Sequence, residues 1–263
     1  PPSKCSFPVF NNLKSKLDFY QILKNSKEKF CIGKLNYSEI KNNSSYAFLL
    51  PTEILITELL NSNLITVGDI AEVVTGFYSG NDGHYLKRSP LVTRGVTKYD
   101  IVPEELIYDV SNNISINGIQ DKRYYIPIVK GGNRRFFKPS EWYMDWSTDA
   151  VYDYKVVNKH KARFQNSSFY FKQGLAVPMV SSSNITAALI DNRLFDQSIV
   201  GIFPREQYNY LLYYLLGFFN SEICNKIIRT INSSTNNSAN YLKKIPIILP
   251  NDKLLFHINN EVL

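Results

Sequence analysis

The pattern of hydrophobic and polar residues changes near residue 64. Before it, apolar residues between Phe10 and Phe30 recur at nearly helical spacing, and a second helix is expected from Pro51 to Leu60, with the proline in its first turn. After it, short apolar runs alternate with clusters of glycine, asparagine and serine, which is typical of strands joined by turns. We therefore predict a helical N-terminal or connecting segment over residues 1–64 and a second domain over residues 65–263.

The second domain is predicted to be rich in strands. The short apolar runs that carry this prediction are Ile65–Val74, Tyr124–Val129, Glu141–Trp146, Ser168–Phe171, Leu175–Val180, Ala187–Ile190, Phe195–Phe203 and Tyr241–Pro250. The last run contains prolines and is therefore expected at the edge of a sheet. Tyr85–Ser115 is expected to hold further short strands and turns.

One long helix is expected to pack on these strands. Residues 206–231 place Leu211, Leu215, Ile227 and other apolar side chains at a period near 3.6. Another helix is expected to begin at Asn251, and residues 151–165 are expected to be helical or irregular. The predicted fold class is α+β: a twisted, mostly antiparallel sheet region with a long packed helix, preceded by a helical segment.

Composition supports a folded protein of the cytoplasm. Hydrophobic residues make up 44% of the 263 residues, which excludes a disordered chain. No apolar run is long enough to span a membrane, and no signal peptide opens the chain. Cys5, Cys31 and Cys224 are far apart and form no CxxC pair, so we expect free thiols in a reducing compartment. The chain starts on Pro1 without methionine, which suggests a piece of a larger protein.

The charge is positive and locally concentrated. The formal net charge is +7, a balance that suits a polyanionic partner without proving one. Two windows contain basic residues and no acids. The first holds Lys122, Arg123, Lys130, Arg134, Arg135 and Lys138, and the second holds Lys155, Lys159, Lys161, Arg163 and Lys172.

The first window includes the most distinctive stretch of the chain, Pro127–Lys138. A β-branched run leads into Gly131-Gly132, which lets the backbone turn tightly and approach another molecule. Arg134 and Arg135 follow, and their planar guanidinium groups suit phosphates or a guanine edge. Taken alone, the stretch is either a loop that contacts phosphates or a guanine edge, or a basic hairpin whose charged side chains are only solvated.

Other loops offer neutral hydrogen-bonding groups. Ser181–Asn184 and Asn232–Asn240 carry the hydroxyl and amide side chains that contact phosphates and adenine, although either could be an ordinary solvated turn. Thr75–Gly83 is punctuated by glycines, but it fits neither a Walker A loop nor a dinucleotide fingerprint. We expect it to be a structural or DNA-facing loop.

Catalytic and metal-binding patterns are weak. His84, His160 and His257 lie in no nucleophile or metal motif, and the sequence motifs of methyltransferase catalysis are absent. Asp145 with Asp153-Tyr154-Lys155 loosely fits a magnesium-dependent nuclease pattern. We therefore predict no catalytic or metal-binding residue in this chain, and a binding role is favoured.

The order of several motifs resembles the C-terminal target recognition domains of bacterial adenine-specific DNA methyltransferases and type IIG restriction–modification enzymes. Type I specificity subunits contain related recognition domains. The resemblance covers roughly residues 65–250. It is carried by Thr66–Gly76, Val129–Gly132 with Trp142–Trp146, Phe171–Gly174, Phe195–Pro204, Leu216–Ser221 and Thr235–Leu249. Arg134-Arg135-Phe136-Phe137 departs from the usual Arg-Lys-Trp-Tyr of that group.

The resemblance implies sequence-specific recognition of double-stranded DNA. A catalytic methyltransferase domain of the same parent chain would flip and methylate an adenine with S-adenosylmethionine, and magnesium would be needed if a nuclease is fused. No cofactor is expected in the present chain. The residues predicted to contact DNA are Lys130, Arg134, Arg135, Lys138, Lys172, Ser182, Ser183, Asn184, Asn236 and Lys243.

Two alternatives remain open at the level of sequence. One is a self-contained nuclease built on Asp145, Asp153 and Lys155. The other is a protein-interaction module of a restriction–modification complex that uses its aromatic surface.

Overall fold

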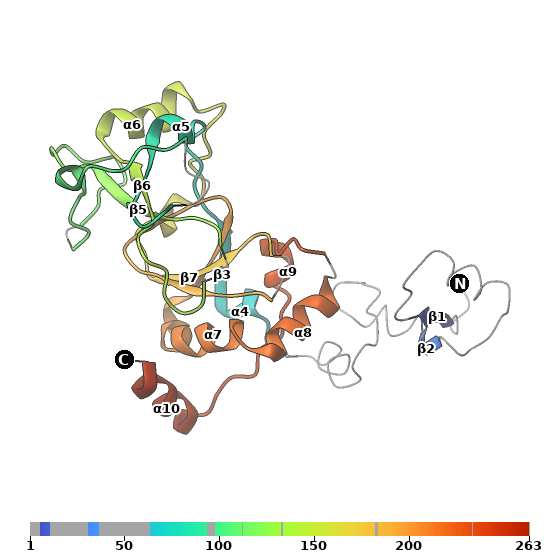
Figure 1. Ribbon diagram of the computed structural model, residues 1–263. Coiled ribbons are helices and arrows are strands. Elements are labelled where there is room, and N and C mark those ends of the chain that lie inside the picture. Colours follow the sequence, from blue (N-terminus) through green and yellow to red (C-terminus); the bar gives the residue numbers. More distant parts are fainter. Residues whose placement is uncertain are drawn as a thin grey trace.

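The structure is a computed structural model (Figure 1), and it describes residues 6–10, 31–36, 64–93, 98–111, 113–132, 134–181, 184–232 and 234–262. The helix predicted between Phe10 and Phe30 lies outside these ranges except for Phe10, which ends a strand, and the helix predicted from Pro51 to Leu60 lies outside them entirely. The described residues of the N-terminal segment form two antiparallel strands that the sequence pattern did not predict, β1 (Ser6–Phe10) and β2 (Cys31–Asn36).

The rest of the chain contains two four-stranded sheets with helices, which confirms the α+β class. The first, here called the central sheet, is antiparallel. Its strands, in spatial order, are β3 (Ala71–Thr75), β10 (Ile199–Pro204), β7 (Gly174–Pro178) and β8 (Ala188–Ile190).

The second sheet is mixed. Its strands are β4 (Leu86–Arg88), β6 (Trp142–Asp145), β5 (Tyr125–Val129) and β9 (Leu194–Phe195), and only the β5–β9 pair is parallel. Because β5 and β6 pair directly, the stretch between them is the connection of an antiparallel strand pair, as the hairpin interpretation predicted.

The central sheet is buried on both faces. Along β7, Leu175 and Val177 join a core formed with the C-terminal helices, whereas Ala176 joins a core rich in aromatic residues. Along β10, Val200 and Ile202 face the helices. Successive side chains of a strand point to opposite faces, so both strands must be apolar throughout. This explains their continuous hydrophobic runs.

The helical layer contains a break that the hydrophobic period did not predict. The stretch 206–231 is helical but divides into η5 (Glu206–Leu211), α7 (Leu212–Phe219) and α8 (Glu222–Ile231). Asn220 lies at the break, where its amide exchanges hydrogen bonds with the backbone of Ala187 at 2.8 and 3.1 Å. Ser221 then caps α8 by accepting a hydrogen bond from the Cys224 backbone N–H. The helix therefore breaks where the Asn220 amide forms hydrogen bonds with the backbone N–H and carbonyl oxygen of Ala187, the residue before β8.

Three other predicted strands differ from the structure. Ser168–Phe171 forms the short 3-10 turn η4 (Ser167–Phe169), and Phe171 then has a positive φ of 62°. Phe195–Phe203 is interrupted by a turn at Asp196–Ser198, so that β9 and β10 belong to different sheets. Tyr241–Pro250 begins inside the helix α9, and among the described residues it makes a single bridge, between Pro246 and Thr66.

The remaining elements are short, apart from the last helix. They are α4 (Val67–Ile70), α5 (Asp82–Tyr85), η2 (Glu104–Leu106), α6 (Thr148–Tyr152), the π-helical turn η3 (Asp153–Val157), α9 (Ala239–Leu242) and α10 (Asp252–Val262). In the part of the chain that the structure describes, no helix has the length and apolar character needed to cross a membrane.

Gly76 offers a test of the junction between the two sheets. A Cβ atom at this position would overlap the backbone carbonyl oxygens of Phe195 and Asp196, which cannot move without disturbing β9. Gly76→Ala should therefore lower the free energy of unfolding by about 1–3 kcal/mol in urea denaturation. Gly217→Ala is the matched control. Gly217 is exposed within α7 with open space around its Cα, so alanine should raise stability by up to about 1 kcal/mol. Equal effects of the two substitutions would contradict this account.

Candidate nucleic-acid interface

Lys130 lies at the centre of an ion-pair cluster that joins three segments. Its Nζ contacts Asp82 Oδ2 at 2.7 Å and Asp196 Oδ2 at 3.0 Å. Burial alone would lower the pKa of Lys130, but the Asp196 and Asp82 carboxylates outweigh burial and raise it. The lysine therefore stays protonated, and the two carboxylates balance its charge. Through these two ion pairs, Lys130 holds α5, the end of β5 and the β9–β10 turn together. Its ammonium is therefore not free to contact a ligand.

The β9–β10 turn extends this cluster to the glycine pair. Asp196 Oδ1 accepts hydrogen bonds from the Ser198 backbone N–H at 2.8 Å and from its hydroxyl at 2.5 Å. The same hydroxyl oxygen accepts the Gly131 backbone N–H at 3.0 Å. Ser198 was not among the predicted site residues. The Asp-x-Ser pattern, which is typical of a turn stabilised by the aspartate side chain, is the signal that could have identified it.

A groove of about 500 Å³ opens at this end of the central sheet, where Thr75, Pro178 and Ser198 lie. It is also lined by Arg163 and Gln197, whose side chains have no hydrogen-bond or ion-pair partner among the described residues. These side chains are the ones that bind phosphates and base edges in protein–DNA complexes.

The second basic window reaches this groove at Arg163. Arg163 and Tyr78 exchange backbone hydrogen bonds at 2.8 and 3.2 Å, which fixes the Thr75–Gly83 loop against the window. Lys159, Lys161 and Arg163 are exposed. Lys155 is different, because its Nζ donates to Ile116 O at 3.0 Å and to Asn117 Oδ1 at 2.8 Å. The window thus supplies exposed cations at Lys159, Lys161 and Arg163 and a structural lysine at Lys155.

The two polar loops meet beside the groove. Ser181 N–H donates to Thr235 O at 2.9 Å, and Asn237 N–H donates to Met179 O at 2.7 Å, so the loops pair like a short antiparallel ladder. Asn184 and Asn236 are both exposed. Ser182 and Ser183 lie outside the described residues. The structure therefore brings together two loops that are separated by about fifty residues in the chain.

The Gly131–Lys138 loop runs from the groove along the edge of β8. The backbone of Phe136, at a φ of 63°, donates to Ala187 O at 2.8 Å and accepts from Leu189 N–H at 2.9 Å. The loop therefore pairs with an edge strand that would otherwise be open. Arg134 contacts Glu141 at 3.0 Å, and Arg135 is exposed without an ion-pair partner among the described residues.

Lys138 turns inward, although it was predicted to contact DNA. Only 4% of the residue is exposed, and its ammonium donates to the backbone carbonyl oxygens of Lys130 and of Gly131. Burial lowers the pKa of Lys138 from 10.5 to about 8. The side chain supports the loop from inside, so we do not place it on the contact surface.

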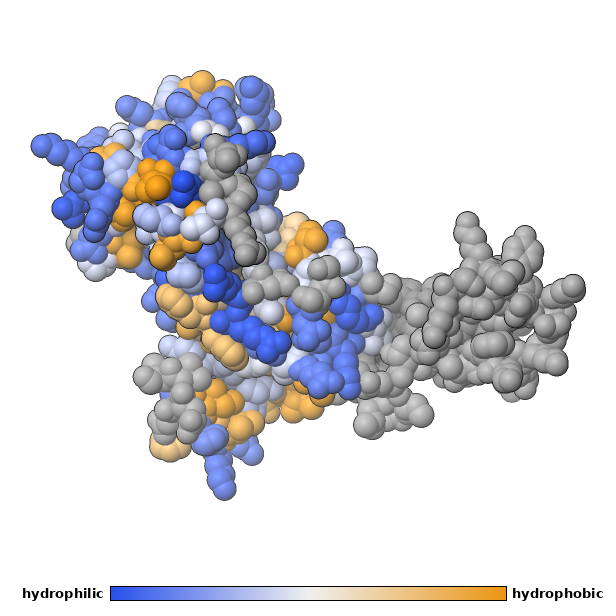
Figure 2. All heavy atoms as spheres, in the orientation of Figure 1, coloured by the Kyte–Doolittle hydropathy of each residue, from blue (hydrophilic) through white to orange (hydrophobic). Residues whose placement is uncertain are grey.

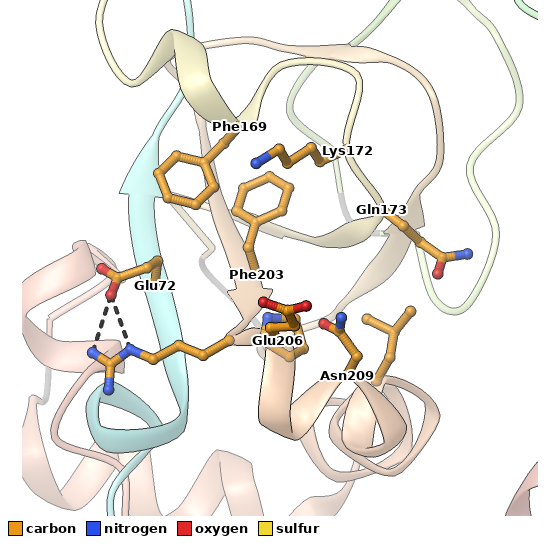
Figure 3. A pocket seen from close by; sticks show the side chains of 10 residues that line it. Glu72, Phe169, Lys172, Gln173, Phe203, Glu206 and Asn209 are labelled. Carbon is orange, nitrogen blue, oxygen red and sulfur yellow. Dashed lines mark hydrogen bonds and ion pairs between the residues drawn. The ribbon is translucent and has the colours of Figure 1, made fainter.

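Lys172 and Lys243 lie at the opposite end of the central sheet, where Ala71 of β3 pairs with Pro204 of β10. Figure 3 shows Lys172 extending toward the Phe169 ring, whose centre lies 5.7 Å from the ammonium, in a pocket of about 670 Å³. The backbone carbonyl of Lys243 accepts from Gly68 N–H at 2.9 Å. The structure thus divides the predicted contact residues between two ends of one sheet.

An apolar groove of about 490 Å³ lies on α7 and α10. Phe136, Tyr213, Ile223 and His257 are among the residues that line it. Phe256 is also 71% exposed on α10, and Figure 2 shows apolar residues gathered around these C-terminal helices. A groove of this kind is where the protein-interaction alternative would place a partner.

The three residues of the nuclease alternative have separate structural partners. Asp145 accepts hydrogen bonds from the Ser147 backbone N–H at 2.9 Å and from the Ser147 hydroxyl. Ser147 is the residue before α6, so these bonds fix the start of that helix. Asp153 accepts from the Tyr85 hydroxyl at 2.9 Å. Burial and this carboxylate raise the pKa of Tyr85 to about 12. Within the described ranges, no group of three or more histidine, cysteine, aspartate or glutamate residues could hold a metal ion.

No protein-family model matches the chain, and no curated protein matches it either. The function must therefore be argued from the residues of the site.

The ion-pair cluster predicts a large cost for removing its cation. Lys130→Met leaves two carboxylates largely buried without a counter-charge, so it should lower the free energy of unfolding by about 2–4 kcal/mol. Adding Asp82→Asn should recover part of this loss. Lys87→Met is the matched control, because the Asp100 carboxylate beside Lys87 is exposed and such pairs contribute about 0–1 kcal/mol. Similar losses in the Lys130 and Lys87 variants, measured by urea denaturation, would show that the cluster is not structural.

The pKa of Lys138 predicts how stability changes with pH. Between pH 8 and 10.5, the unfolded chain still holds a proton on Lys138 that the folded chain has released. The free energy of unfolding contributed by this group therefore rises with pH across this window, by on the order of 1–3 kcal/mol. Denaturation curves at several pH values should show this rise in the wild type relative to Lys138→Met. The exposed Lys253 provides the control substitution Lys253→Met, and parallel pH profiles for all three proteins would contradict the prediction.

Proposed function

We propose that this chain recognises double-stranded DNA and that it is the target recognition domain of a restriction–modification adenine-N6 DNA methyltransferase. The proposal is supported chiefly by one observation. A single groove at one end of the central sheet is lined by Arg163 of the second basic window, by Gln197 and by the Lys130 ion-pair cluster. The two amide-rich loops pair beside this groove, next to Val180, although these segments lie far apart in the sequence.

The chemistry of the groove suits both parts of DNA recognition. Lys159, Lys161 and Arg163 are exposed cations, and such groups bind phosphates and set the register of a protein on the duplex. Gln197 in the groove and Asn184 and Asn236 on the adjoining loops carry amides, which suit the donor and acceptor pair on the adenine edge in the major groove. Positive charge alone would give binding without selectivity, so the amides are essential to the proposal.

The catalytic steps belong elsewhere in the proposed parent enzyme. A methyltransferase domain in the same parent chain would flip the target adenine and use S-adenosylmethionine, and a fused nuclease would require magnesium. None of the described residues is assigned to either cofactor. The parent activity is proposed from the sequence resemblance alone, whereas the role proposed for this chain also has support from the groove.

Duplex binding measured against salt tests the proposal. Each phosphate contact that is lost should reduce the slope of log affinity against log salt by about 0.9. We expect salt-sensitive binding of short duplexes by the wild type and a shallower slope for the combined substitution Lys159→Gln, Lys161→Gln and Arg163→Gln. Lys253→Gln removes an exposed charge from α10 and should leave the slope unchanged.

Specificity requires a separate measurement. Selection from a pool of randomised duplexes should enrich one short sequence, and Gln197→Ala should relax the enrichment at one position while keeping the salt slope. Absence of salt-sensitive duplex binding would rule out the proposed function. Salt-insensitive capture of a protein subunit on the α7–α10 groove would instead favour the interaction module.

A further inference from the structure

Lys138 is an unusual buried cation. Lys130, eight residues earlier, has two carboxylates within 3.0 Å. Lys138 is 4% exposed and has no ion pair among the described residues, and its ammonium donates only to backbone carbonyl oxygens. A lysine placed in this way contributes through the geometry of its hydrogen bonds, because its charge is costly to bury.

The hydrogen bonds of Lys138 close the loop on itself. From the far end of the loop, the side chain reaches back to the carbonyls of Lys130 and Gly131, where the loop begins. The guanidinium of Arg193 donates to Lys138 O at 2.5 Å and also lies over the Phe137 ring at 5.6 Å. The start of the loop, its end and the neighbouring β8–β9 turn are therefore held together, and Arg134 and Arg135 are exposed between these anchors.

We propose that Lys138 is a positioning residue that braces the Gly131–Lys138 loop so that Arg134 and Arg135 face DNA, and that it is not itself a phosphate contact. This inference rests on the proposed function. The sequence pattern predicted that Lys138 contacts DNA, whereas this inference gives it a structural role inside the loop.

The electrostatic surroundings are consistent with a brace. The charged groups that face Lys138 are Glu141, Arg134 and Asp196, with the ion-paired Lys130 and the guanidinium of Arg193 also close by. Burial dominates over all of them and lowers the pKa of Lys138 to about 8. A neutral amine still has two N–H bonds, which match the two carbonyl oxygens. The brace can therefore persist when the proton is lost, whereas a phosphate contact would require the full charge.

The salt slope separates a brace from a contact. Lys138→Met should weaken duplex affinity several-fold while the slope stays within error of the wild type, because no phosphate contact is removed. Arg135→Gln is the matched control from the same loop. It should also weaken binding, but it should reduce the slope by about 0.9 because a phosphate contact is lost.

Hydrogen exchange provides a readout that needs no DNA. The backbone N–H groups of Gly131, Phe136 and Leu189 are the ones that hold the loop to its neighbours. All three should exchange faster in Lys138→Met and remain unchanged in Arg135→Gln, with circular dichroism confirming that both variants are folded.

The combined results distinguish the two proposals. An unchanged slope with faster exchange in Lys138→Met supports the brace. A slope reduced by about 0.9 with unchanged exchange overturns it and makes Lys138 a phosphate contact, which leaves the proposed function intact. Faster exchange in a protein that binds no duplex under any salt condition overturns the proposed function but supports the bracing of the loop.

Discussion

The Lys130 ion pairs are the interaction on which the rest of the interface depends. One ammonium group contacts carboxylates that lie 48 and 66 residues away in the chain, at 2.7 and 3.0 Å. Asp82 belongs to α5 after the glycine-punctuated loop, and Asp196 opens the β9–β10 turn that carries Ser198. The ion pairs therefore join α5, the end of β5 and the β9–β10 turn at one end of the central sheet. Lys130, Asp82 and Asp196 themselves line the groove, and Arg163 and Gln197 lie in the same lining.

The central sheet provides the rigid base for this arrangement. Its middle strands β10 and β7 are covered by the helices on one face and by an aromatic core on the other. Gly76 lies against the carbonyl oxygens of Phe195 and Asp196, so β3 and the β9–β10 turn approach each other more closely than any side chain would permit. Binding residues on loops are positioned best when the scaffold beneath them is packed on both sides, as it is here.

Charge by itself is a poor guide to which residues contact a ligand in this protein. Lys130, Lys138 and Lys155 all lie in the acid-free windows, but each is used internally, by carboxylates or by backbone carbonyls. Arg135, Lys159, Lys161 and Arg163 are the exposed members of the same windows. The proposed DNA surface is therefore smaller than the basic sequence pattern implied. It lies at one end of the sheet, while Lys172 and Lys243 lie at the other.

The sequence alone determined the α+β class and the positions of several buried strands, because a continuous apolar run such as the one that contains β7 is stable only where both faces of the strand are covered. It also identified the glycine pair before the two arginines and the two amide-rich loops. Local patterns could not show the break at Asn220, which depends on an amide binding the distant backbone of Ala187, or the direction in which Lys138 points. Those features were decided by the tertiary structure, because a polar side chain takes the partner that folding brings within reach, and spacing along the chain does not specify that partner.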